Sequence, residues 1–196
     1  TGTRGVPDIP GGVETHCQNL FPLIMRQANE VEIRISRRNI YVNKLINSYK
    51  GIQLRDIYSP RSKKTEAIIH TFLSILDAKK WGADIIHIHS IGPGVLIPFA
   101  KLLGLKVVFT NHGPDYERDK WKGLSKLLLK LGEFLSSRFS NKVIAISEDI
   151  QKRLLTKYSV QSTLIYNGVE KKRIIKSNKF IDTLGVKSKK YIFTAV

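Results

Sequence analysis

Short apolar runs rich in isoleucine and valine alternate along the chain with longer stretches in which apolar residues recur at helical spacing. The short runs are typical of strands buried on both faces of a sheet, and the longer stretches are typical of amphipathic helices. Strands are predicted over residues 31–36, 52–57, 85–89, 106–110, 142–146, 163–166 and 191–196. Helices are predicted over residues 13–27, 65–80, 95–103, 124–138 and 148–157. This order predicts an α/β protein in which a Rossmann-like parallel sheet carries helices on both faces.

The opening segment TGTRGVPDIPGGVETH is rich in glycine and has no predicted strand in front of it. In a doubly wound sheet such a loop follows the first strand, because backbone N–H groups at the start of the next helix bind phosphate there. We therefore expect residues 1–168 to form a Rossmann-like domain that lacks its first strand. Residues 169–190 are expected to be a basic linker, and residues 191–196 the start of a truncated second domain.

Lysine and arginine outnumber aspartate and glutamate by 33 to 16, which gives a net charge of +17. This charge favours a polyanionic partner, such as nucleic acid, an anionic lipid surface or a phosphorylated substrate. The basic residues are spread along the chain rather than grouped with aromatic residues, which argues against nucleic acid. The one cysteine, Cys17, favours a reducing compartment, and no apolar stretch reaches the ~18 residues of a membrane-spanning helix.

Three histidines lie in or just after predicted strands. His87 and His89 in IIHIHS project from the same face of their strand, because side chains alternate along a strand. Together with His112 in VVFTNHG they form a candidate metal site, and the alternative is that they are hydrogen-bonded residues of the interior. No D-x-D sequence is present to hold a divalent ion beside a nucleotide diphosphate. His112 lies at the carboxyl end of a strand, where open α/β sheets bind ligands, so it is the candidate catalytic residue.

Residues 120–139, KWKGLSKLLLKLGEFLSSRF, combine a broad apolar face with lysines on the opposite side of the predicted helix. A basic amphipathic helix of this kind is typical of a segment that lies on anionic lipid. The alternative is a helix that packs its apolar face on the sheet and leaves the lysines in water. The two interpretations are compatible, because core packing leaves the lysines free.

Five segments in a fixed order carry a resemblance to a known family: TGTRGVPDIPGGVETH, ADIIHIHS, VVFTNHG, KVIAISE and LIYNGVE. Over residues 1–170 the chain resembles the N-terminal domain of retaining glycosyltransferases of family 4, in the subgroup that builds bacterial surface polysaccharides. The resemblance implies a GT-B fold, in which two Rossmann-like domains face each other across a cleft. It makes this chain the acceptor-side half, with the nucleotide held by the other domain.

The resemblance also implies roles for individual residues. Gly11 and Gly12 match the glycine loop whose backbone amides approach the diphosphate of the donor. His112 matches the histidine that contacts the transferred sugar near its anomeric carbon. Ser147 and Asn167 match positions that shape the acceptor side of the cleft.

The implied reaction transfers a sugar from a nucleotide sugar to a glycan or a lipid-linked acceptor with retention of configuration, without a metal or another cofactor. Arg4 is expected to meet a phosphate of the acceptor, an inference from its charge and position. This chain alone is expected to be inactive, because the residues that grip the nucleotide belong to the C-terminal domain of the family. The expected location is the cytoplasm, with peripheral attachment to the inner face of the plasma membrane. The rival interpretations are a GT-B sugar-nucleotide epimerase and a basic α/β module that binds nucleic acid or another polyanion.

Overall fold

The computed structural model describes residues 1–28, 30–62, 65–168, 183 and 185. Its first elements are helix α1 (Gly12–Gln27), strands β1 (Arg34–Arg38), β2 (Ser48–Tyr49) and β3 (Ile52–Ile57), and helix α2 (Glu66–Trp81). Then follow β4 (Ile85–His89), α3 (Ile91–Gly94), α4 (Ile97–Leu102), β5 (Lys106–Asn111), α5 (Gly123–Phe139), β6 (Lys142–Ala145), α6 (Glu148–Tyr158) and β7 (Thr163–Leu164). Most of the predicted linker and the strand predicted at 191–196 lie outside the described residues. None of the described helices has the length and hydrophobicity that crossing a bilayer requires.

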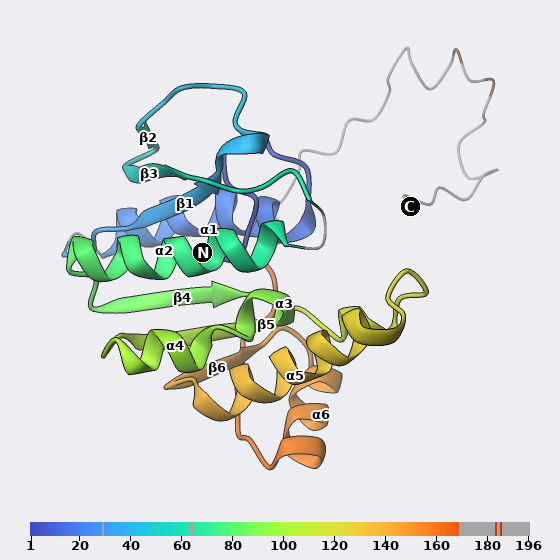
Figure 1. Ribbon diagram of the computed structural model, residues 1–196. Helices are drawn as coiled ribbons and strands as arrows, with labels where there is room; N and C mark the ends of the chain where they lie inside the picture. The colour runs from blue at the N-terminus through green and yellow to red at the C-terminus, as the bar shows by residue number, and fades with distance from the viewer. Residues whose placement is uncertain (29, 63–64, 169–182, 184, 186–196) are drawn as a thin grey trace.

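The strands form two sheets, which lie one above the other in the view of Figure 1. In the three-stranded sheet β3 pairs in parallel with β1 and antiparallel with β2. In the four-stranded sheet β4, β5, β6 and β7 follow one another and all pairs are parallel. We call the three-stranded sheet with α1 the small half, and the four-stranded sheet with α3 to α6 the large half. The α/β class is confirmed, whereas β2 was not predicted because a two-residue strand contains no apolar run.

A cavity of about 370 Å³ lies between the facing sides of β1 and β4 and is lined by residues of both strands and of α1. The first residues of the chain close one end of this gap, and Figure 1 places the N-terminus between the two sheets. Thr1 N donates to His87 O at 2.8 Å, and His89 N donates to Thr1 O at 3.1 Å. On the other side Arg38 N donates to Arg4 O at 2.8 Å. These are backbone bonds of the kind that join parallel strands, so residues 1–4 connect the two sheets at the carboxyl ends of β1 and β4.

Buried apolar side chains form one cluster in each half. The cluster of the large half, which Ile75 of α2 joins, contains Ile86, Ile88, Ile91, Ile97, Ala100, Leu105, Val107, Phe109, Tyr116, Leu129, Val143, Ala145, Ile150 and Leu154. The cluster of the small half contains Val6, Cys17, Ile35, Ile52 and Leu54. The large half therefore holds the main hydrophobic core.

The helix predicted at 95–103 is α4, shorter at both ends, and the short helix α3 before it was not predicted. Pro98 lies in the first turn of α4, where its missing N–H costs no helical hydrogen bond, so it starts a new helix rather than continuing the old one. Helix α3 packs closely on α5, because a Cβ added to Gly132 would overlap the carbonyl oxygen of Ile91. This contact holds the segment after β4 against α5.

Helix α5 turns a different face to the core from the one that its apolar pattern predicts. Its buried residues are Leu129, Gly132, Glu133, Ser136 and Ser137. Leu124 and Leu127 are 82% and 63% exposed, and Leu131 and Phe134 are each 44% exposed. Small and polar residues allow α5 to lie close to α3, and several of its large apolar residues remain accessible. Packing on the sheet therefore does not account for this apolar face.

Candidate active site

The carboxyl ends of the parallel strands open onto a hollow of about 540 Å³. The glycine loop, the end of β1, the segments after β4 and β5 and the first turns of α5 line it. The residues of the predicted site that line it are Arg4, Gly11, Gly12, His112 and Asn167. Open α/β sheets bind their ligands at this edge. The fold thus brings together side chains from both ends of the described sequence, and Ser147 alone of the predicted set is not among the lining residues.

The glycine loop presents bare backbone to the hollow at the start of α1. Gly11 has φ +150°, and a Cβ added there would overlap Glu14 Oε2, whereas a Cβ on Gly12 would meet nothing within 4 Å. Glu14 Oε1 accepts a hydrogen bond from Arg4 N at 2.8 Å, which ties the loop to the N-terminal segment. The start of a helix with free N–H groups is suited to an anion, and here the Glu14 carboxylate is the negative group beside it.

His112 follows β5 and reaches the hollow from the large half. Its Nε2 lies 3.1 Å from Nδ1 of His89. Burial, and then the neighbouring His16, lower the pKa of His112 to about 4, so the imidazole is neutral at pH 7. A neutral imidazole with so low a pKa is a poor base, but its ring nitrogens still donate and accept hydrogen bonds.

His87 and His89 share one face of β4, as the alternation of the strand predicts. Their rings stack with centroids 4.1 Å apart, and His87 Nε2 lies 2.7 Å from Thr110 Oγ1. Burial is the main cause that lowers the pKa of His87 to about 3. No group of three or more His, Cys, Asp and Glu side chains in the described ranges is arranged to hold a metal ion. The contacts of this pair are those of hydrogen-bonded interior histidines.

Basic and acidic side chains are both present around the hollow. Two of the cations are paired with carboxylates: Arg38 with Glu66, and Arg118 with Asp115. Arg4 and Lys120 also line the hollow, and neither forms an ion pair with any carboxylate of the described residues. Arg4 Nη1 donates to Pro10 O at 2.9 Å, which leaves its other guanidinium donors for a ligand. The two unpaired cations are therefore the groups that an anionic substrate would meet.

Ser147 has a structural role at the start of α6. It is the N-cap residue, and its Oγ accepts a hydrogen bond from Ile150 N at 3.3 Å. Such a cap satisfies one of the free N–H groups of the first helical turn. A direct role of Ser147 at the acceptor stays a prediction.

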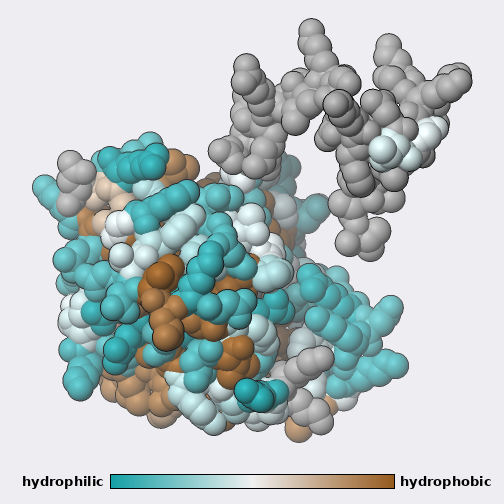
Figure 2. Space-filling view, turned by 90° about the horizontal axis from the view of Figure 1, so that it is seen from above, coloured by the Kyte–Doolittle hydropathy of each residue, from teal (hydrophilic) through white to brown (hydrophobic). Residues whose placement is uncertain are grey.

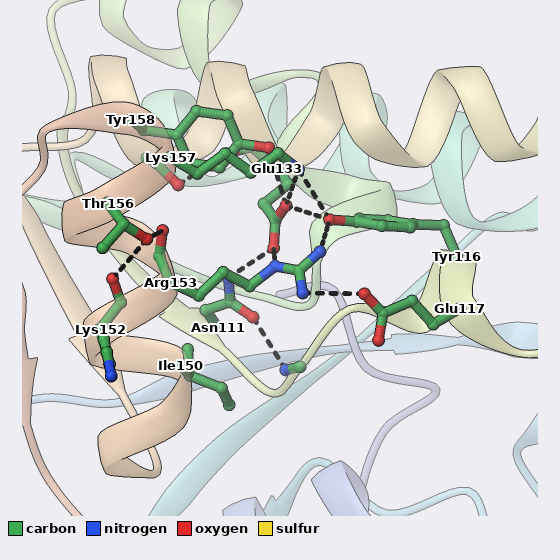
Figure 3. Close-up of polar contacts among 12 residues, drawn as sticks. Asn111, Tyr116, Glu117, Glu133, Ile150, Lys152, Arg153, Thr156, Lys157 and Tyr158 are labelled. Atoms are coloured by element: carbon green, nitrogen blue, oxygen red, sulfur yellow. Dashed lines mark hydrogen bonds and ion pairs between the residues drawn. The ribbon is translucent and has the colours of Figure 1, made fainter.

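A buried polar cluster beside the hollow was missed from the sequence (Figure 3). Glu133 is 0% exposed. Its carboxylate accepts hydrogen bonds from Tyr116 Oη at 2.7 Å, Tyr158 Oη at 2.8 Å, Lys157 Nζ at 3.3 Å and Asn111 Nδ2 at 3.3 Å. Burial by itself would raise the pKa of Glu133, but these hydrogen bonds and the charge of Lys157 lower it below its usual value. The carboxylate is therefore ionised and fully partnered.

This cluster fixes the loop that carries His112. Asn111 donates to Glu133 through Nδ2 and accepts from Gly113 N at 2.8 Å through Oδ1, so it holds the backbone on both sides of His112. Arg153 of α6 contacts Tyr116 Oη and forms an ion pair with Glu117 at 2.8 Å. The one sequence signal was a lone glutamate in the leucine-rich stretch KLLLKLGEFL.

The fold and the hollow together define a class, the Rossmann-like domains that bind a ligand at the carboxyl edge of a parallel sheet. Over residues 10–173 the sequence matches Glycosyltransferase Family 4, and the chain belongs to that family. Its structure is similar to that of a sucrose-phosphate synthase from Thermosynechococcus elongatus, with a TM-score of 0.50 and 15% identity over 76% of this chain and 85% of that chain. That likeness shows the fold of an N-terminal GT-B domain. A search of curated proteins found no match.

Proposed function

We propose that this chain is the acceptor-side domain of a retaining glycosyltransferase that acts in the synthesis of cell-surface polysaccharide. The donor is a nucleotide sugar, and the acceptor is a glycan or a lipid-linked sugar. The observation that carries the proposal is the hollow itself, where the glycine loop, His112 and two unpaired cations meet at the carboxyl edge of the sheet of a family 4 domain.

In this proposal each group at the hollow has one task. The N–H groups at the start of α1, at Gly11 and Gly12, face the diphosphate of the donor. His112 contacts the sugar that is transferred, and Arg4 meets a phosphate of the acceptor. The transfer uses no metal, because charge on the departing diphosphate is met by backbone N–H groups and basic side chains. The nucleotide is held by the C-terminal domain of the family, so this chain does not catalyse transfer alone.

Calorimetric titration tests this division of labour. The 196-residue chain and a version extended by the C-terminal domain are each titrated with UDP, GDP and dTDP. We expect nucleotide binding only by the extended protein, with one base preferred. Tight nucleotide binding or sugar transfer by the chain itself would overturn the proposal.

The acceptor is tested with a short-chain prenyl diphosphate sugar. We expect the chain to bind it, and Arg4→Gln to weaken binding by about tenfold or more, because a hydrogen bond to a charged group is lost. Arg55→Gln is the matched control, since this arginine is 59% exposed on β3 and does not line the hollow. Equal losses in the two variants would show that Arg4 acts only through the overall charge.

We also propose that α5 attaches this domain to an anionic membrane at the inner face of the plasma membrane. The accessible apolar residues Leu124, Leu127, Leu131 and Phe134 lie on the same helix as Lys126 and Lys130, and Lys122 is its N-cap residue. Apolar side chains that enter the interface and lysines that meet anionic headgroups are the two requirements for binding at a lipid surface. The net charge of +17 supports electrostatic attraction to such a surface. Figure 2 shows that hydrophilic residues cover most of the molecule in that view, with apolar patches among them.

Liposome flotation distinguishes membrane binding through α5 from attraction by the net charge alone. The chain is expected to float with vesicles of phosphatidylglycerol and not with vesicles of phosphatidylcholine. The double variant Leu124→Ser and Leu127→Ser is expected to lose most of this binding. Leu102→Ser is the control, because Leu102 is 85% exposed on α4, outside the proposed surface. Equal flotation with both lipids, or equal loss in the control, would overturn the proposal.

A further inference from the structure

A line of three side chains runs from α1 through β4 to the hollow. Cys17 Sγ lies 3.7 Å from His89 Nε2, and His89 Nδ1 lies 3.1 Å from His112 Nε2. Cys17 and His89 are each 1% exposed, so water does not compete for these contacts. We propose that Cys17 and His89 are positioning residues that fix the tautomer of His112, with the proton on Nδ1.

The direction of the hydrogen bonds follows from the chemistry of the first member. Burial raises the pKa of the Cys17 thiol to about 12, so the group keeps its S–H. An S–H group is a weak donor and its sulfur is a weak acceptor, whereas an unprotonated imidazole nitrogen is a good acceptor. The favourable arrangement is therefore donation from Cys17 Sγ–H to His89 Nε2, which places the proton of His89 on Nδ1.

His89 then donates from Nδ1 to Nε2 of His112. Burial lowers the pKa of both histidines, so each ring carries one proton and not two. Because Nε2 of His112 is the acceptor, its single proton is on Nδ1. The reverse order would leave the N–H of His89 directed at the thiol sulfur, a buried donor with a poor acceptor.

This tautomer gives His112 a defined task, which rests on the proposed function. Nδ1 of His112 has no hydrogen-bond partner among the described residues, and the side chain lines the hollow. With its proton on Nδ1, His112 donates a hydrogen bond to an oxygen of the transferred sugar. It does not take a proton from the acceptor, because a ring with a pKa of about 4 is a poor base.

The test is the pair of ¹⁵N chemical shifts of the His112 ring in the full 196-residue chain at pH 7. Protonated and unprotonated ring nitrogens give well-separated shifts, so the spectrum reports the tautomer directly. We expect Nδ1 to be the protonated nitrogen. In Cys17→Ala the ratio of tautomers should move toward the other form by about twofold, the lower end of the range for a hydrogen bond, because S–H is a weak donor.

Two further variants make the test specific. Cys17→Ser supplies an O–H donor and should restore the tautomer that Cys17→Ala loses. Thr110→Val removes the hydroxyl partner of His87, which forms no hydrogen bond with His112, and should leave the His112 shifts unchanged. A proton on Nε2 in the parent chain, or the same spectrum in Cys17→Ala, would overturn the inference. Because the measurement contains no sugar, it stands or falls separately from the proposed function.

Discussion

The small half and the large half of the domain differ in how much apolar core they enclose. The large half encloses the main hydrophobic core around Phe109 and Ile88, both 0% exposed. The small half has a much smaller apolar cluster, and two buried arginines at the end of β1 add ion pairs to it. Arg37 is 2% exposed and reaches Asp56 through Nε at 2.6 Å and Nη2 at 3.0 Å, and Arg38 pairs with Glu66 at 3.1 Å.

The difference implies that the large half is the more rigid of the two. Hydrophobic stabilisation scales with the apolar area that is buried, so the half with the larger apolar cluster is held together more strongly. The hollow lies between the halves, with the glycine loop on the small half and His112 on the large half. We therefore expect the small half to open first. Among the following predictions, the comparison of Ile88→Ala with Ile52→Ala tests that order.

Acid should produce the largest effect. Burial is the main cause that lowers the pKa of His70 and His87 to about 3, so both are neutral in the folded chain and take up protons on unfolding below pH ~6.5. The contribution of these two histidines to the free energy of unfolding is fully present above that pH. It falls as the pH drops toward their pKa values in the folded chain, by ~1.4 kcal/mol per pH unit for each histidine. Urea denaturation from pH 7 to 4 measures it. The slope should be shallower in His87→Gln, and an unchanged slope would contradict the prediction.

Glu133→Ala should be the most damaging single substitution in the large half. It removes the shared acceptor of Tyr116, Tyr158 and Lys157 and leaves a cation without its partner. Loss of one member of a buried charge network costs about 3–5 kcal/mol. Glu117→Ala is the control, because this side chain is 57% exposed and its pair with Arg153 is worth at most ~1 kcal/mol. Similar chemical denaturation midpoints for the two variants would show that the cluster is not structural.

The same truncation made in each core allows the two halves to be compared: Ile88→Ala in the large half and Ile52→Ala in the small half. Both isoleucines are 0% exposed, and either truncation should cost about 2–5 kcal/mol locally. Amide hydrogen exchange should show lower protection throughout the domain in Ile88→Ala. In Ile52→Ala the loss should be confined to β1, β3 and α1, because opening of the small half does not require unfolding of the large half. Uniform loss in both variants would mean that the halves unfold as one unit.

Ser147→Ala should have the smallest effect. It removes the hydrogen bond from Ile150 N and should lower the free energy of unfolding by ~1 kcal/mol, as other N-cap substitutions do. The control is Thr156→Ala in the same helix, whose hydroxyl bonds only to carbonyl groups of the preceding turn. If acceptor binding falls in Ser147→Ala while α6 keeps its exchange protection, the residue also acts at the acceptor.

Much of the fold could be predicted from the sequence. The strands at 52–57 and 85–89 have the predicted limits, because a short isoleucine-rich run between polar segments has few other buried conformations. The short helix α3 was missed, since its close packing on α5 depends on contacts between distant segments.

The candidate site could be predicted only in part. Glycines before a helix and a histidine after a strand are local signals, and both lie at the hollow. Glu133 was missed because its partners come from β5, the loop after β5 and α6, and no local pattern reports such a meeting. The roles of the lining residues stay predictions, since geometry places a side chain without showing what it binds.

The position of Cys17 allows local opening of the domain to be measured by thiol labelling. This is the one thiol in the sequence, and it is covered where α1 packs on β4. An alkylating reagent can reach Cys17 only when α1 moves away from β4, so the rate of labelling reports how often that opening occurs. An acceptor that contacts both the glycine loop and His112 would make this opening rarer and slow the labelling. Ligand binding could therefore be followed with a reagent that does not enter the hollow.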